Sequence, residues 1–292
     1  MLTSANILFG IVFLGQIFLI SYYFPQKILA RMDYVRTSFP KSQYPRLYPK
    51  PAEYYVVGRW AFKLATRIIL ALGFVILFSI IFLVDHATFA DDGFISEAFP
   101  AAYGIIQFLP LMALEISEFS QYKLMRKAHV ATTRTAELSR RGLFNFISPT
   151  LLGMALAMYF GAILLDLYAH QFELAWGHDT VQRTIVLTIT NLLLAAVGAW
   201  ILYGKKLSPH QTANDRIKHI KTSLHSFFYI SMAMSVFWMT QAADDIYDLD
   251  FLDATIMSVY FQLIILLSIG HTLRNMRLED IDFDLYKERP AT

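Results

Sequence analysis

The sequence predicts an all-α, polytopic membrane protein built as a seven-transmembrane-helix bundle. Hydrophobic residues make up 56% of the 292 residues and charged residues only 16%, whereas about a quarter of an ordinary globular domain is charged. The apolar residues gather in seven continuous stretches, each close to the roughly 17–25 residues that a helix needs to cross a bilayer. Continuous rather than alternating apolar runs predict helices and not a barrel.

The seven stretches predict a transmembrane domain over residues 1–271. The predicted helices cover residues 5–24, 64–84, 101–118, 146–167, 184–203, 227–243 and 254–270. The first stretch is expected to be a retained helix and not a cleaved signal peptide. No basic segment precedes it, and residues 20–24 offer no small-residue cleavage site.

The charges between the stretches alternate from one connection to the next. All 25 Lys and Arg residues except Arg183 fall after the first, third, fifth and seventh stretches, or at helix ends facing those connections. The other connections are acidic. Short loops rich in Lys and Arg stay cytoplasmic, so we expect the N-terminus outside and the C-terminus cytoplasmic. The pattern suits a bacterial inner (plasma) membrane, with the basic loops against an anionic cytoplasmic leaflet, and argues against nucleic acid as a partner.

Two segments are expected on the cytoplasmic side. Residues 25–63 form a basic connection rich in Pro and Tyr, which is either a linker lying on the bundle or a docking strip for a cytoplasmic protein partner. Residues 272–292 form a tail that changes from basic to acidic. Long helices joined by small loops are also compatible with a homo-oligomer.

Carboxylates within a predicted helix give the first candidate site. Glu115 and Glu118 are three residues apart and therefore share a helix face, and Gln107 lies two turns further out. Ionisable groups inside a membrane segment are costly and typically face a water-filled path, so these residues are the pathway candidates. The alternative is that the helix ends earlier and both glutamates pair with Lys123 or Arg126.

The acidic outer connections give a second candidate site. Rings of carboxylates raise the local cation concentration at a pore entrance. The outer cation-attracting candidates are Asp85, Asp91, Asp92, Asp166, Asp244, Asp245 and Asp248. His86 beside Asp85, and His170 four residues after Asp166, add candidate ligands for an outer divalent cation; the alternative is that these groups are simply solvated.

The outer aspartates also contain a recognisable pattern. Residues 244–248 read D-D-x-x-D, which resembles the aspartate-rich motif of prenyl-diphosphate enzymes. In those enzymes carboxylates hold Mg²⁺ against a diphosphate, because a hard cation prefers oxygen ligands. An outer location and the lack of a second such motif favour a solvated acidic loop instead.

Histidines near the cytoplasmic ends of the last two predicted helices give a candidate cofactor site. His225 and His271 are placed where two imidazoles could ligate a haem iron; the alternative is interfacial histidines bound to backbone or lipid headgroups. No resident cofactor is otherwise expected, and the chain has no cysteine, which removes disulfides and thiolate chemistry.

Together these patterns favour a channel or transporter for a small cation, proton or polar solute. The alternatives are a non-enzymatic sensor, signalling or scaffold subunit that acts through a partner, and a metal-dependent membrane lipid enzyme that uses the outer aspartates.

Overall fold

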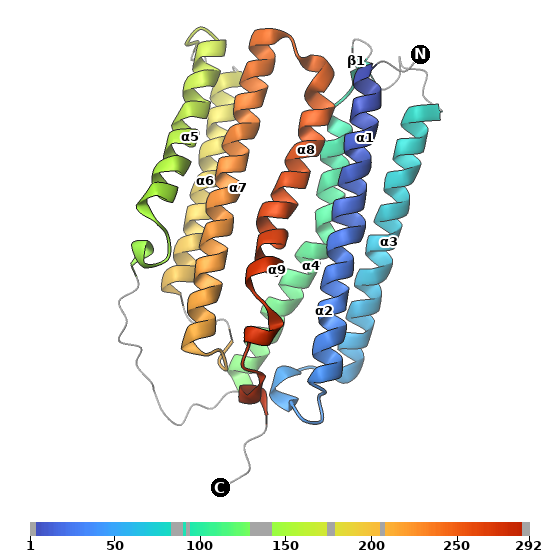
Figure 1. Ribbon diagram of the computed structural model, residues 1–292, viewed down its shortest axis with the longest axis vertical. Helices are drawn as coiled ribbons and strands as arrows, with labels where there is room; N and C mark the ends of the chain where they lie inside the picture. Colours follow the sequence, from blue (N-terminus) through green and yellow to red (C-terminus); the bar gives the residue numbers. More distant parts are fainter. Residues whose placement is uncertain are drawn as a thin grey trace.

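The computed structural model describes residues 4–82, 90–91, 94–128, 142–173, 179–204 and 208–287. Within these residues the protein is all-helical apart from one short antiparallel pair, β1 (Ala90–Asp91) with β2 (Phe94–Ile95). Long helices lie side by side along one axis (Figure 1). The principal helices are α1 (Ser4–Phe18), α2 (Phe24–Ser38), α3 (Ala52–Phe82), α4 (Ala98–Ala128), α5 (Pro149–Ala169), α6 (Asp179–Tyr203), α7 (Ala213–Tyr247), α8 (Asp253–Ile265) and α9 (His271–Asn275).

Six helical segments of the described chain are long and apolar enough to cross a membrane, which indicates a multi-pass membrane protein. They are Ser4–Ser38, Ala52–Phe82, Ala98–Ala128, Pro149–Ala169, Thr180–Tyr203 and Asp250–Asn275. Large apolar side chains such as Phe18, Phe82 and Leu192 are exposed, whereas Gln16 and Ser258 are fully buried. Polar groups inside and apolar groups outside are typical of a bundle that faces lipid.

The remaining long helix, α7, is more polar and is not among these six segments. It packs against α5, α6 and α8, and buried positions recur along it from Arg216 to Asp244. A helix that packs mainly against protein does not need an apolar surface on every side. Its central position therefore explains why its hydropathy is lower.

The helices form two groups that meet at α7 and α8. In one group α1, α3, α4 and α8 contact one another, and in the other α5, α6 and α7 do so (Figure 1). Along the joint, the Gln241 side chain donates to Asp253 at 3.5 Å, and the Phe237 and Tyr260 ring centroids are 4.6 Å apart. Near the other end, Ser226 Oγ and His271 Nδ1 are 3.0 Å apart. The antiparallel α7–α8 pair thus connects the two groups over most of its length.

The bundle has two chemically different ends. We call the end where α7 passes to α8 the acidic end and the opposite end, where α6 passes to α7, the basic end. α1 begins at the acidic end, and the C-terminal segment lies at the basic end (Figure 1). The ends of the described chain therefore lie at opposite ends of the bundle.

Several helices extend beyond the apolar stretches that predict them. At 1.5 Å per residue, the 31 residues of α3 and of α4 each span about 46 Å, more than the roughly 30 Å of a hydrocarbon core. Helices α3 and α4 therefore continue by whole turns beyond the predicted spans, before residue 64 and after residue 118. These extensions carry charged side chains, so hydropathy alone does not detect them.

Two π-helical turns interrupt the long helices at neighbouring places. Turn η1 (Leu19–Tyr23) joins α1 to α2, and turn η5 (Leu266–Gly270) joins α8 to α9. A Cβ placed on Gly270 would lie 3.1 Å from the Phe24 ring, so the end of η5 lies against the first residue after η1. Single π-turns inside α-helices often mark functional regions.

The basic end is covered by folded connections. Tyr48 donates to Phe39 O at 2.8 Å, Tyr44 is buried, and the proline-rich segment of the predicted docking strip packs on α2. After α9 the chain continues through short 3-10 turns, and the Phe283 ring stacks on Phe39 with centroids 3.9 Å apart. Ser208 Oγ and Tyr286 Oη are 3.2 Å apart. Residues 276–287 therefore link α2 to the α6–α7 connection.

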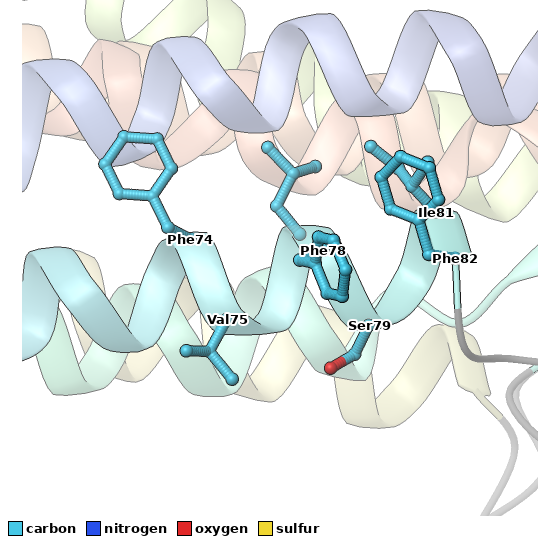
Figure 2. A pocket seen from close by; sticks show the side chains of 7 residues that line it. Phe74, Val75, Phe78, Ser79, Ile81 and Phe82 are labelled. Atoms are coloured by element: carbon cyan, nitrogen blue, oxygen red, sulfur yellow. The ribbon is translucent and has the colours of Figure 1, made fainter.

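The outward face of α3 carries a shallow apolar groove. Its lining residues all belong to α3 and are Phe74, Val75, Leu77, Phe78, Ser79, Ile81 and Phe82. Figure 2 shows these side chains along one helix, with a single hydroxyl among them. A groove of this composition fits lipid chains and offers no catalytic groups.

Candidate functional site

The first cluster at the acidic end is built around Arg183, near the start of α6. Its guanidinium donates to Asp166 Oδ1 of α5 at 3.2 Å and also to Asp245 of α7. The His170 ring lies between the same carboxylates, with Nδ1 3.8 Å from Asp166 Oδ1 and Nε2 3.7 Å from Asp245 Oδ2. We call these four residues the Arg183 cluster. The cluster connects α5, α6 and α7 through Arg183, the one basic residue that the sequence pattern does not place beside the basic connections.

The second cluster consists of Asp244, Asp250 and Asp253, and we call it the Asp244 cluster. One carboxylate oxygen from each residue lies within 4.8 Å of the others. α7 ends at Tyr247, and the left-handed conformation of its C-cap residue Asp248 (φ 53°) reverses the chain. A 3-10 turn, η4 (Asp250–Leu252), then leads directly into α8 at Asp253. This tight connection brings three carboxylates from successive elements to one place.

The Asp244 side chain is the most confined member of this cluster. It is only 5% exposed, and its Oδ1 is buried without a hydrogen-bond partner among the residues that the structure describes. Burial and, after it, the negative charges of Asp253 and Asp250 raise the pKa of the Asp244 carboxyl to about 6. The cluster therefore holds more negative charge than its surroundings neutralise.

Glu97, which precedes α4, adds a fourth carboxylate nearby. Burial raises its pKa, the charge of Arg183 opposes that rise, and the charge of Asp244 adds to it. Its negative charge also interacts electrostatically with Asp253. The acidic end thus gathers carboxylates from both helix groups.

The D-D-x-x-D pattern is divided between the two clusters. Asp244 lies with Asp250 and Asp253, Asp245 pairs with Arg183, and Asp248 forms the left-handed end of α7. The three aspartates of the motif therefore do not converge on one metal in this conformation. This arrangement does not favour the lipid-enzyme hypothesis.

A buried hydrogen-bond network occupies the first helix group. Gln16 Nε2 donates to Gln107 Oε1 at 3.0 Å, and Gln107 Nε2 donates to Ser21 Oγ at 2.8 Å. Ser21 Oγ lies 3.2 Å from Tyr103 Oη, which donates to the Ile69 carbonyl at 2.9 Å. We call this the glutamine network. Gln107, a pathway candidate from the sequence, is thus buried at the centre of α1, α3 and α4.

A polar stripe on α8 leads from the Asp244 cluster towards this network. Thr255, Ser258 and Gln262 recur at spacings of three and four residues and share one face. The Thr255 and Ser258 hydroxyl oxygens are buried and have no hydrogen-bond partner in the described chain. Gln262 donates to Val12 O of α1 at 3.0 Å, and a Cβ on Gly15 would lie 3.1 Å from Gln262 Oε1. The stripe therefore ends one residue from Gln16.

Glu115 and Glu118 lie elsewhere. Both side chains are exposed on the part of α4 that points to the basic end. Tyr122 donates to Glu118, and Tyr54 Oη lies 2.8 Å from Ser117 Oγ on the same turn. The structure does not bring these glutamates into contact with buried Gln107.

His225 and His271 are neighbours near the basic end, as expected. Their ring centroids are 6.4 Å apart, and the Tyr229 ring stands edge-on to His271 at 5.3 Å. His225 Nδ1 lies 2.8 Å from Lys221 O, and His271 Nδ1 bonds Ser226. The backbone contact of His225 is of the kind that the interfacial alternative expects, whereas His271 contacts a side chain, and the haem hypothesis stays a prediction.

Several sequence candidates cannot be placed. Asp85, His86 and Asp92 lie outside the described residues, and Asp91 is described only through its backbone in β1. In contrast, Arg183, Asp250, Asp253 and Thr255 were not among the candidates. Arg183 had a usable indication in the sequence, because a lone cation among acidic connections needs a carboxylate partner.

Comparison of this chain with known protein families, with curated proteins and with solved structures found no match.

Proposed function

We propose that this protein is a membrane channel or transporter for a proton or small cation. In this proposal the chain crosses the membrane seven times, with α7 as the additional span through residues 227–243. The acidic end faces outside and the basic end faces the cytoplasm of a bacterial inner membrane. The alternation of basic and acidic connections supports this orientation.

The observation that carries the proposal is a series of four buried oxygen atoms without hydrogen-bond partners in the described chain, where Asp166 Oδ2 and Arg59 Nε are the other two buried side-chain polar atoms without a partner. The four oxygens are Asp244 Oδ1, Thr255 Oγ1, Ser258 Oγ and Gln16 Oε1. Buried polar atoms are ordinarily satisfied by protein or by ordered water. Oxygen atoms coordinate hard cations. They also accept hydrogen bonds from the waters of a proton-conducting chain. A polar path from the acidic end to the middle of the bundle accounts for all four.

The series has a direction. The carboxylates at the acidic end attract cations, and Asp253 and Gln262, nine positions apart, are separated by about 14 Å along α8. Beyond Gln262 the path reaches the glutamine network beside the π-helical turn η1. Gln107 keeps its proposed role as a path residue, whereas the exposed positions of Glu115 and Glu118 favour a place at the cytoplasmic mouth.

The test is flux through the purified protein in liposomes, measured with pH-sensitive and K⁺- or Na⁺-sensitive dyes under imposed gradients. The variant Thr255→Val/Ser258→Ala removes two hydroxyls that make no described hydrogen bond, so folding is retained. Losing one oxygen ligand worth about 1 kcal/mol slows transfer by roughly fivefold. We therefore expect at least that reduction in the double variant.

Ser79→Ala is the matched control, because it removes a hydroxyl from the outward face of α3 (Figure 2). Its flux should equal that of wild type. Glu115→Gln/Glu118→Gln should reduce flux less than Thr255→Val/Ser258→Ala. Folded wild-type protein that passes no ion under any gradient, or equal flux in Thr255→Val/Ser258→Ala and wild type, would overturn the proposal.

A further inference from the structure

The acidic end also has the features of an ion-binding site. Such binding is separate from transport, because the ion stays at the surface whether or not any solute crosses the membrane. We infer that the Asp244 cluster binds a divalent cation with the chemistry of Ca²⁺, through carboxylate oxygens of Asp244, Asp250 and Asp253.

The spacing of the oxygens supports this assignment. Ca²⁺ binds oxygen ligands at about 2.3–2.6 Å, so ligands on opposite sides of the ion are about 5 Å apart. The three carboxylate oxygens lie within 4.8 Å of one another. This spacing is close to that of oxygens around a single Ca²⁺ ion, so the three carboxylates are near enough to share one ion.

An independent observation points to a ligand at this place. Asp244 is nine-tenths or more buried, and its Oδ1 has no hydrogen-bond partner in the described ranges. A buried carboxylate oxygen without a partner is strongly unfavourable. Its carboxylate group points at Asp250 and Asp253, so a cation bound there satisfies it.

The neighbouring Arg183 cluster shows what neutralisation by protein looks like at the same end. There a guanidinium contacts both Asp166 and Asp245, although Asp166 Oδ2 is itself buried without a hydrogen-bond partner among the described residues. Among the residues that the structure describes, no Lys or Arg forms an ion pair with Asp244, Asp250 or Asp253. Gln241 donates one hydrogen bond to Asp253 at 3.5 Å but brings no charge.

The donor set selects the class of ion. The cluster offers carboxylate oxygens alone, whereas the imidazole of His170 belongs to the Arg183 cluster. Oxygen-only sites favour Ca²⁺ or Mg²⁺ over Zn²⁺. Because three separate elements supply the carboxylates, binding would fasten the end of α7 to the start of α8.

The test uses the full-length protein in detergent, stripped with a chelator and titrated with CaCl₂ alone at pH 7.5 and constant KCl. Calorimetry gives the stoichiometry and thermal unfolding gives the stabilisation. We expect one ion per chain with a midpoint near the roughly 10⁻⁴–10⁻³ M of extracellular sites. The Asp250→Asn variant should weaken that midpoint by at least about tenfold.

Asp248→Asn is the matched control, because it removes the same charge from the same connection without touching the cluster. It should keep the wild-type midpoint. Asp250 is exposed, so Asp250→Asn tests the site even if Asp244→Asn fails to fold. No saturable Ca²⁺ response in wild type, or equal midpoints in Asp250→Asn and Asp248→Asn, would overturn the inference. Neither measurement uses flux, so its outcome is separate from that of the transport proposal.

Discussion

The Arg183 cluster and the Asp244 cluster lie next to each other at the acidic end. The consecutive residues Asp245 and Asp244 belong to the first and the second cluster, respectively. The first contains its own cation, and its carboxylates pair with it. The second contains three carboxylates and no basic partner among the described residues. The comparison shows that the negative charge of the two clusters is neutralised in different ways. In the Arg183 cluster a side chain supplies the positive charge, whereas the Asp244 cluster depends on protons or ions from solution.

The largest expected effect is on the Arg183 cluster. Arg183→Gln leaves Asp166, which is 4% exposed, without its cation, and breaking a buried pair this way costs about 3–5 kcal/mol. Chemical unfolding in detergent measures the loss. Adding Asp166→Asn to Arg183→Gln should recover at least half of it, because the buried charge is then removed.

An exposed ion pair is the control for this effect. Lys218 and Asp280 lie 3.3 Å apart with both side chains more than two-fifths exposed. Lys218→Gln should cost less than about 1 kcal/mol. Equal losses in Lys218→Gln and Arg183→Gln would mean that the Arg183 cluster is an ordinary surface pair.

An intermediate effect is expected from pH on the Asp244 cluster of chelator-treated protein. The pKa of Asp244 is raised to about 6 in the folded protein, so the folded state binds a proton that the unfolded chain has released. Its stabilising contribution is present below about pH 4 and is lost as pH rises through 6. Asp244→Asn should match wild type near pH 4 and be more stable at pH 7.5 by roughly 2–3 kcal/mol.

Comparing the two proteins at each pH removes the contribution of other titrating groups. Those facing Asp244 are Asp245, Asp250, Asp253 and Glu97, with Arg183 beyond them. Thermal unfolding from pH 4 to pH 8 gives the difference directly. A difference between Asp244→Asn and wild type that stays constant with pH contradicts the assignment.

The smallest effect is expected at His170. Its ring nitrogens are 3.7 and 3.8 Å from the carboxylate oxygens of Asp245 and Asp166, longer than direct hydrogen bonds, and Nδ1 makes a local contact of 2.9 Å with the Asp166 backbone oxygen. His170→Gln should therefore change the unfolding free energy by less than about 1 kcal/mol. A loss as large as that of Arg183→Gln would show that the imidazole stabilises this cluster as much as the guanidinium does.

The sequence predicts the helices well because apolar length is a local property. It predicts their ends poorly, since the extension of α3 before Leu64 carries Arg59 and Lys63 and pairs with α2 through Asp33 at 2.5 Å. Only the folded chain shows that these charged turns are helical.

The candidate site was predictable in part. The concentration of aspartates at residues 244–253 is visible in the sequence, and so is the isolation of Arg183. The division of Asp244 from Asp245 is not visible, because it depends on which helix each side chain faces. The sequence likewise places Gln107 and Glu118 eleven residues apart on one helix. It does not show that Gln107 is buried and Glu118 exposed.

The π-helical turns η1 and η5 have a consequence for how the chain tolerates changes in length. A π-turn accommodates one residue more than an α-helical turn, so deleting one residue from Leu19–Tyr23 can restore regular helix there. The same deletion inside α1 would rotate every following side chain by about 100° and remove Gln16 from Gln107. Natural or engineered single-residue deletions and insertions should therefore survive at these two turns before they survive anywhere else in the two helices.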